Sequence, residues 1–181
     1  MEIRDYNGPG EWSAWAVRQR YLAYCKRHGR DPRVVAPQVH VEGDVRWVYP
    51  IMFSVIDGIR AGDPACVDLG LEFIESGHSQ AFGRTLHATV ACVLRQSSLN
   101  PEHVGRLRAR ILGMLVAGQV PREYREYAKL LRRIGLGEGW AAARQSVDRG
   151  NQYVMRYVNY FDTCASIGAP HEAGPITQRE K

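Results

Sequence analysis

The chain has 181 residues, of which 24 are lysine or arginine and 19 are aspartate or glutamate, so its net charge at neutral pH is +5. Hydrophobic residues make up 45% of the sequence, which excludes an intrinsically disordered chain and predicts one domain with its own core. The apolar runs are shorter than the roughly 20 residues needed to cross a bilayer, and the N-terminus lacks the apolar segment of a secretory signal. We therefore expect a cytoplasmic protein without a membrane partner.

Prolines mark several predicted helix starts. Asp31-Pro32, Asp63-Pro64 and Asn100-Pro101 each place a capping side chain before a proline. Proline is tolerated at the first helical position because its missing N–H needs no partner there. Together with the apolar periodicity, these signals predict helices over residues 11–28, 50–61, 64–76, 79–97, 101–117, 121–135 and 140–166.

Two segments outside these helices have a different composition. Pro37, Gly43 and an alternation of valines predict a loop or a short hairpin within residues 33–49. Glycine and proline are frequent after residue 166, which predicts a disordered tail over 167–181. Residues 1–166 are therefore predicted to form a single helical domain.

Two consecutive helix pairs share a pattern. A shift of 37 residues, the distance from Asp63 to Asn100, aligns residues 63–97 with 100–134 and places His87 on Tyr124. This arrangement resembles the HEAT and armadillo classes of helical repeats. The resemblance implies an all-α fold of stacked antiparallel helix pairs, with the first and last helices capping the two ends. The alternative is that two unrelated amphipathic hairpins with similar caps align equally well.

Motifs for catalysis or cofactor binding are incomplete. The segment 77–85 has five residues between its glycines and an arginine where a phosphate-binding loop has lysine. Glu75 and His78 have the Glu-x-x-His spacing of di-iron bundles, but the required second copy is missing. The cysteines, which are expected to be free thiols, lack metal-ligand spacing: Cys25, Cys66, Cys92 and Cys164. We therefore predict no cofactor, no metal and no catalytic residues.

Charge is distributed unevenly between the two helix pairs. Residues 63–97 carry a net charge of −2, whereas residues 100–134 carry eight basic and three acidic side chains. The acidic half predicts a patch for a cation or a basic partner, formed by Asp68, Glu72 and Glu75. The basic half and the last helix supply the candidate partner-binding residues Arg106, Arg110, Arg122, Arg125, Lys129, Arg132, Tyr124 and Tyr157. A solvated helix face with no partner is the alternative for both sets.

The favoured function is a protein-binding helical module that is not an enzyme, because its charge polarity suits electrostatic docking. The tract that includes Tyr49-Pro50-Ile51-Met52 and residues 121–129 resembles uncharacterised bacterial proteins, some of them immunity proteins. That resemblance implies an inhibitor that binds and blocks a toxin. The alternative is nucleic-acid binding through the arginine-rich helices 101–135. An enzyme on a helical-repeat scaffold ranks third.

Overall fold

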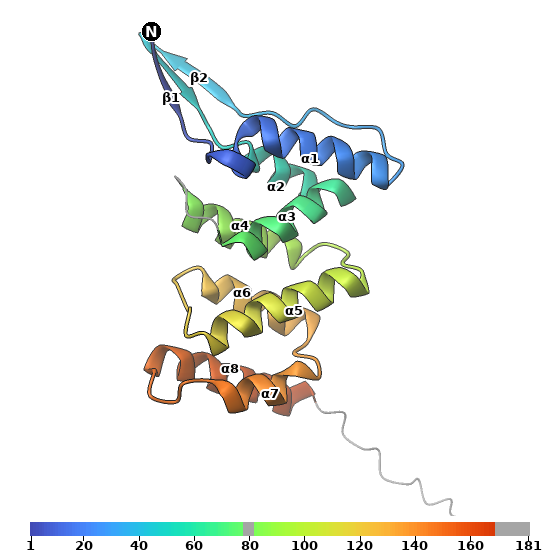
Figure 1. The fold of residues 1–181 in the computed structure, drawn as a ribbon, viewed down its shortest axis with the longest axis vertical. Coiled ribbons are helices and arrows are strands. Elements are labelled where there is room, and N and C mark those ends of the chain that lie inside the picture. Colours follow the sequence, from blue (N-terminus) through green and yellow to red (C-terminus); the bar gives the residue numbers. More distant parts are fainter. Residues whose placement is uncertain (78–81, 169–181) are drawn as a thin grey trace, which may run out of the picture.

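The computed structural model describes residues 1–77 and 82–168 and is mostly helical (Figure 1). A short 3-10 helix, η1 (Gly10–Trp12), precedes the first α-helix. None of the helices in these ranges is long and apolar enough to span a membrane. The described α-helices are α1 (Ala14–Arg27), α2 (Met52–Arg60), α3 (Pro64–Ser76), α4 (Gly83–Leu94), α5 (Pro101–Val116), α6 (Tyr124–Ile134), α7 (Gly139–Ser146) and α8 (Gln152–Gly168).

The prediction of an all-α fold is confirmed in part, because the mostly helical chain also contains a small sheet. Its strands are β1 (Glu2–Asp5), β2 (Val39–Glu42) and β3 (Val45–Val48), in the order β1-β3-β2. The hairpin of β2 and β3 confirms one of the two structures expected within residues 33–49, and β1 pairs with β3 in parallel. Figure 1 shows this sheet projecting from one end of the molecule, beyond α1.

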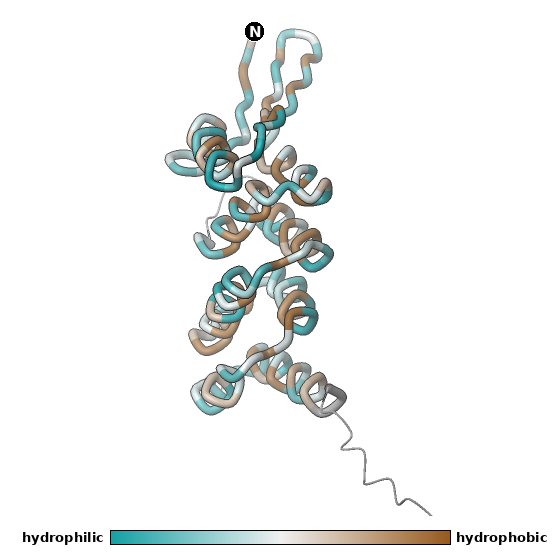
Figure 2. The backbone as a smooth tube through the Cα atoms, turned by 90° about the vertical axis from the view of Figure 1, so that its right-hand side faces the viewer, coloured by the Kyte–Doolittle hydropathy of each residue, from teal (hydrophilic) through white to brown (hydrophobic). Residues whose placement is uncertain are grey.

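The helices lie in two rows. Helices α1, α3, α5 and α7 contact one another in that order, and α2, α4, α6 and α8 form the second row in the same way. Consecutive helices therefore alternate between the rows, and α3 also contacts α2 and α4 across them. Figure 2 views the helices nearly end-on and shows the two rows beside each other.

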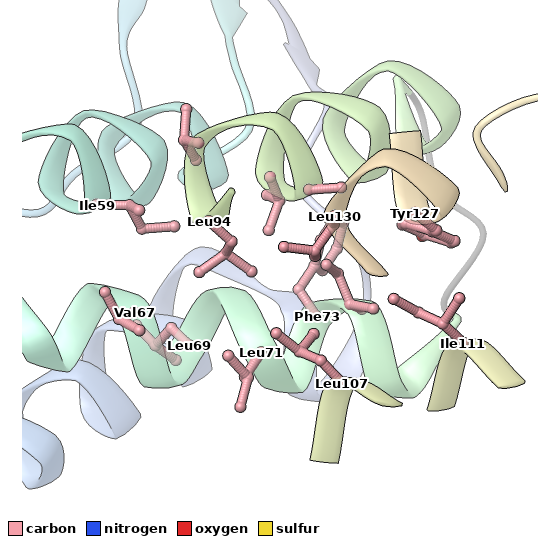
Figure 3. Packing of buried hydrophobic residues seen from close by; sticks show 14 of the residues in the cluster. Ile59, Val67, Leu69, Leu71, Phe73, Leu94, Leu107, Ile111, Tyr127 and Leu130 are labelled. Atoms are coloured by element: carbon pink, nitrogen blue, oxygen red, sulfur yellow. The ribbon is translucent and has the colours of Figure 1, made fainter. Parts of the chain in front are cut away.

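The core fills the space between the rows. The side chains of Phe73 on α3, Leu94 on α4, Leu107 on α5 and Leu130 on α6 are each fully buried (Figure 3). These apolar residues recur on one side of each helix, so burying that side removes them from water together. The opposite side of each helix is left for polar residues, which is where the candidate site lies.

Side-chain caps fix the starts of α3 and α5 as predicted. Asp63 accepts a hydrogen bond from the backbone N–H of Ala65 at 3.0 Å, and Asn100 accepts one from that of His103 at 2.8 Å. Asp31-Pro32 starts no helix, because the chain there runs as an irregular connection into β2. The caps therefore act only where an apolar helical stripe follows them.

The single helix predicted over residues 140–166 is two helices. The chain leaves α7 at Val147, whose backbone is extended, and turns through Asp148 to Asn151 before α8. Asn151 Oδ1 accepts hydrogen bonds from the N–H groups of Tyr153 at 3.0 Å and Val154 at 3.3 Å. This cap provides the break that the apolar periodicity alone does not reveal.

Candidate functional site

The second row of helices carries a concentrated set of cations. Arg125, Lys129 and Arg132 recur at three- and four-residue spacing on α6, so they share the side opposite the buried Tyr127 and Leu131. Helices α4 and α8 flank α6 and add further arginines. We call the whole set the basic face: Arg84, Arg95, Arg122, Arg125, Lys129, Arg132 and Arg156.

The basic face contains two connected hollows. One lies between α4 and α6, has a volume of about 760 Å³ and includes Arg84, Arg95 and Arg122 in its lining. The other lies between α6 and α8, has a volume of about 340 Å³ and includes Arg132, Arg156 and two tyrosines. Arg125 and Lys129 line both, so the hollows form one continuous surface.

Only part of this charge is neutralised within the protein. Glu126 accepts hydrogen bonds from Arg95 Nη1 at 3.4 Å and from Lys129 Nζ at 2.5 Å. Among the described residues, four guanidinium groups of the basic face donate no hydrogen bond, form no ion pair and lie over no aromatic ring: those of Arg84, Arg122, Arg125 and Arg156. These groups can form charge-assisted hydrogen bonds to a carboxylate or a phosphate without first breaking an internal contact.

Two tyrosines form the apolar floor of the hollow between α6 and α8. Tyr157 and Tyr160 are half-buried, and burial raises the pKa of both hydroxyls above the ordinary value. The guanidinium carbon of Arg132 lies 5.9 Å from the ring centroid of Tyr160, within cation–π distance. The hollow therefore combines flat aromatic surface with cationic donors, a mixture that is enriched at protein interfaces.

Tyr124 does not belong to this surface, contrary to the prediction. Its side chain is fully buried, and its hydroxyl donates a hydrogen bond to the backbone oxygen of Ile111 at 3.0 Å. Its ring packs edge-on against that of Tyr157, with 4.7 Å between ring centroids. Tyr124 therefore acts as a core residue that links α5 to α6 and supports Tyr157 from beneath.

The predicted arginines of α5, Arg106 and Arg110, bind to the neighbouring helix α3. Arg106 forms a two-pronged ion pair with Glu75 of α3, with N–O distances of 2.9 and 2.5 Å. Arg110 Nε donates to the backbone oxygen of Ile74 at 3.2 Å, near the end of α3. Arg106 is therefore separate from the basic face, whereas Arg110 borders it through a cleft that it lines together with Arg84 and Arg122.

The predicted acidic patch is a polar seam between helices of the first row. Asp68 is buried and lies 2.8 Å from Nε2 of His28, which directly follows α1, and 2.9 Å from Nε2 of His103 on α5. Glu72 accepts hydrogen bonds from Arg20 and Tyr24 of α1, and Glu75 pairs with Arg106. The seam consists of these three carboxylates and their partners, so the patch is not an open surface for a cation or a basic protein.

Part of the basic face was not predicted from the sequence, and some residues that were considered there lie outside the described part of the chain. The basic face includes Arg84, Arg95 and Arg156, and one of its hollows is lined by Tyr160. All four residues lie outside the basic stretch 100–134. Only the contacts among α4, α6 and α8 bring them there, so the local charge gave no signal. His78, which belongs to the rejected Glu-x-x-His pair, and much of the loop 77–85 lie outside the described residues.

The structure also shows how the cysteines and possible metal ligands are placed. Cys25 and Cys66 are buried free thiols, and Cys92 and Cys164 are partly buried. Within residues 1–77 and 82–168 no group of three or more His, Cys, Asp or Glu side chains is arranged so that it could hold a metal ion. Comparisons with protein-family models, with curated proteins and with solved structures found no match.

Proposed function

We propose that this chain is a non-catalytic binding module whose basic face docks on an acidic protein surface. The four unpaired guanidinium groups on that face carry the proposal. Their charge is compensated there by two carboxylates, those of Glu123 and Glu126, which leaves a strong local excess of positive charge. Such an excess steers an acidic partner into contact and fixes its orientation.

The scaffold that we propose is a short stack of helix pairs of the HEAT or armadillo kind. The alternation of the helices between two rows supports this, as do the matching proline and side-chain caps of α3 and α5. In such a stack each pair contacts its neighbours, and one row of helices presents an extended surface to a partner. Helices α4, α6 and α8 supply that surface here.

A protein fits the basic face better than a nucleic acid does. Glu126 lies between Arg95 and Lys129, and Glu123 lines the same hollow, so a continuous phosphate backbone would meet two like charges. A protein surface can place separate carboxylates opposite Arg125 and Arg156 and leave a donor or a gap opposite the glutamates. The half-buried Tyr157 and Tyr160 add the aromatic area typical of protein interfaces.

The resemblance to bacterial immunity proteins suggests a more specific form of the proposal, in which the acidic partner is a toxin that this chain blocks. Co-expression of the chain with the product of the neighbouring gene tests this form. We expect the two proteins to purify together and cell growth to be restored. Failure of both would remove the toxin-inhibitor form and leave the basic face to be tested separately.

Charge reversal tests the basic face directly. The double variant Arg125→Glu/Arg156→Glu changes two unpaired cations of the face, and Arg18→Glu/Arg30→Glu makes the same change at exposed arginines in and after α1. Tagged wild-type chain and both variants are used for affinity capture from the source cells. We expect a protein that binds the wild type and the α1 control and is lost from the basic-face variant.

A second measurement separates a protein partner from a nucleic acid. Binding of a short DNA duplex, a single-stranded RNA and poly-glutamate is measured at low and at physiological salt. We expect poly-glutamate to bind through the basic face. Duplex or RNA binding that survives physiological salt and disappears in Arg125→Glu/Arg156→Glu would refute the choice of a protein partner and favour nucleic acid.

A further inference from the structure

The three-stranded sheet stands apart from the helical core. All residues of β1 and β2 are exposed, and only three residues of β3 are partly buried. Tyr6 anchors the base of the sheet by stacking on Trp47 and Tyr49, with ring centroids 6.1 and 6.4 Å apart. Short strands need a covered apolar face to be stable. A further partner would therefore stabilise an exposed sheet of this size.

The outer edge of β2 offers backbone groups for pairing. Gln38 accepts a hydrogen bond from the N–H of Tyr49 at 2.9 Å, so Gln38, His40 and Glu42 direct their backbone groups toward β3. The N–H and C=O groups of Val39 and Val41 therefore point away from the sheet. In the described part of the chain β2 pairs with β3 alone, so this edge is open.

The edge of β1 is better protected than that of β2. Three of its four residues are charged, and Arg4 pairs with Glu2 at 2.7 Å, which discourages another strand from adding there. On β2, the side chains of Val39 and Val41 are 48% and 56% exposed. Their β-branched side chains favour a strand, so β2 is the edge to which another strand can add.

We infer that β2 pairs in antiparallel fashion with β2 of a second copy of this chain. In the register that places Val41 opposite Val41 of the second copy, the two residues exchange backbone hydrogen bonds at the twofold axis. The same register places His40 opposite Glu42 of the second copy, and Glu42 opposite its His40. The edge is thus complementary to itself in hydrogen bonding and in polar pairs.

This pairing joins two sheets into one of six strands. Because the two β2 strands run in opposite directions, the helical bodies lie at opposite ends of the joined sheet. Figure 1 shows that α6 and α8 lie away from the sheet, so the parts of the basic face on these two helices stay uncovered. The dimer therefore displays two binding surfaces, although its formation does not depend on what those surfaces bind.

Sedimentation of the full chain tests the inference over about 1–200 µM. We expect a species of twice the 20.4 kDa chain mass that dissociates on dilution. Val41→Pro removes only an outward-facing N–H, so we expect the hairpin to persist while the dimer dissociation constant rises by about tenfold or more. Ile3→Pro is the matched change on the edge of β1 and should leave dimerisation unaltered. Circular dichroism confirms that both variants are folded.

A charge exchange tests the register. His40→Glu places two carboxylates opposite each other twice in the dimer and should weaken it, whereas His40→Glu/Glu42→Lys restores opposite charges and should restore it. A wild-type chain that is monomeric over the whole range would overturn the inference. So would a dimer that Ile3→Pro dissociates and Val41→Pro does not, because that result places the interface on β1. A dimer that His40→Glu leaves intact would refute the register.

Discussion

Replacing Asp68 by alanine should destabilise the fold more than any other change in the polar seam. Asp68 is 5% exposed and receives hydrogen bonds from His28, which directly follows α1, and from His103 on α5. Alanine leaves the buried Nε2 of His103 without this acceptor. The variant therefore loses two contacts that bridge helices, and Asn100 Nδ2, at 3.3 Å, is the polar neighbour that His103 Nε2 keeps.

The size of the effect follows from these two contacts. A hydrogen bond to a charged group contributes about 1.5–3 kcal/mol to the free energy of unfolding. The side chain of His28 is 28% exposed and can turn toward water, so its contact is assigned the low end of that range. His103 is buried and is assigned the upper half. We expect a total loss of about 4 kcal/mol.

Equilibrium unfolding in urea, followed by circular dichroism, measures this loss. With a slope of about 2 kcal/mol per molar urea, the midpoint should fall by roughly 2 M while the slope stays constant. Asp57→Ala is the matched control, because Asp57 lies on α2 and forms an exposed pair with Arg60 at 2.8 Å. We expect that control to change the stability by less than about 1 kcal/mol.

Two results would contradict this reasoning. A loss below about 1 kcal/mol for Asp68→Ala would mean that the buried carboxylate costs as much to desolvate as its contacts return. A double-mutant cycle with His103→Ala that gives no coupling energy would show that the short distance between the two residues stabilises nothing.

Three further predictions concern other buried groups. Tyr124→Phe should lose about 1 kcal/mol in urea unfolding, because it removes the hydroxyl that donates to Ile111. Gly58→Ala should destabilise by about 1–3 kcal/mol, since its Cβ would lie 2.2 Å from Cys66 Sγ, whereas Gly105→Ala, with open space around it, should stabilise by up to about 1 kcal/mol. Burial and the hydrogen bond to Glu72 raise the pKa of Tyr24 from 10.0 to about 12, so the stability that this group provides below pH 10 should be lost as the pH rises toward 12. Thermal melts between pH 10 and pH 12 should show that Tyr24→Phe loses less stability over this range than the wild-type chain does.

The periodicity of α6 shows how much of the burial of its side chains can be predicted from the local sequence pattern. It places Tyr124, Tyr127 and Leu131 on one apolar side and the cations on the other, and the structure has them so. The same pattern could have excluded Tyr124 from the candidate contacts, since a residue on the apolar side is covered by the neighbouring helix. The same periodicity predicts that Arg125 and Arg132 are exposed, as they are, and places Lys129, whose side chain is 32% exposed, on their side of the helix.

Local sequence determined where most helices lie, because caps and apolar stripes act within a few residues. Asp63 and Asn100 start α3 and α5 in this way. Tertiary structure alone decided features that join distant segments. The charged β1 has no pattern of its own and becomes a strand through pairing with β3. The sequence predicts Asp68 as part of a surface patch, but in the fold it is covered by contacts with His28, which follows α1, and with His103 on α5. The basic face likewise exists only because packing places α4, α6 and α8 side by side, since Coulomb interactions depend on distance in space and not along the chain.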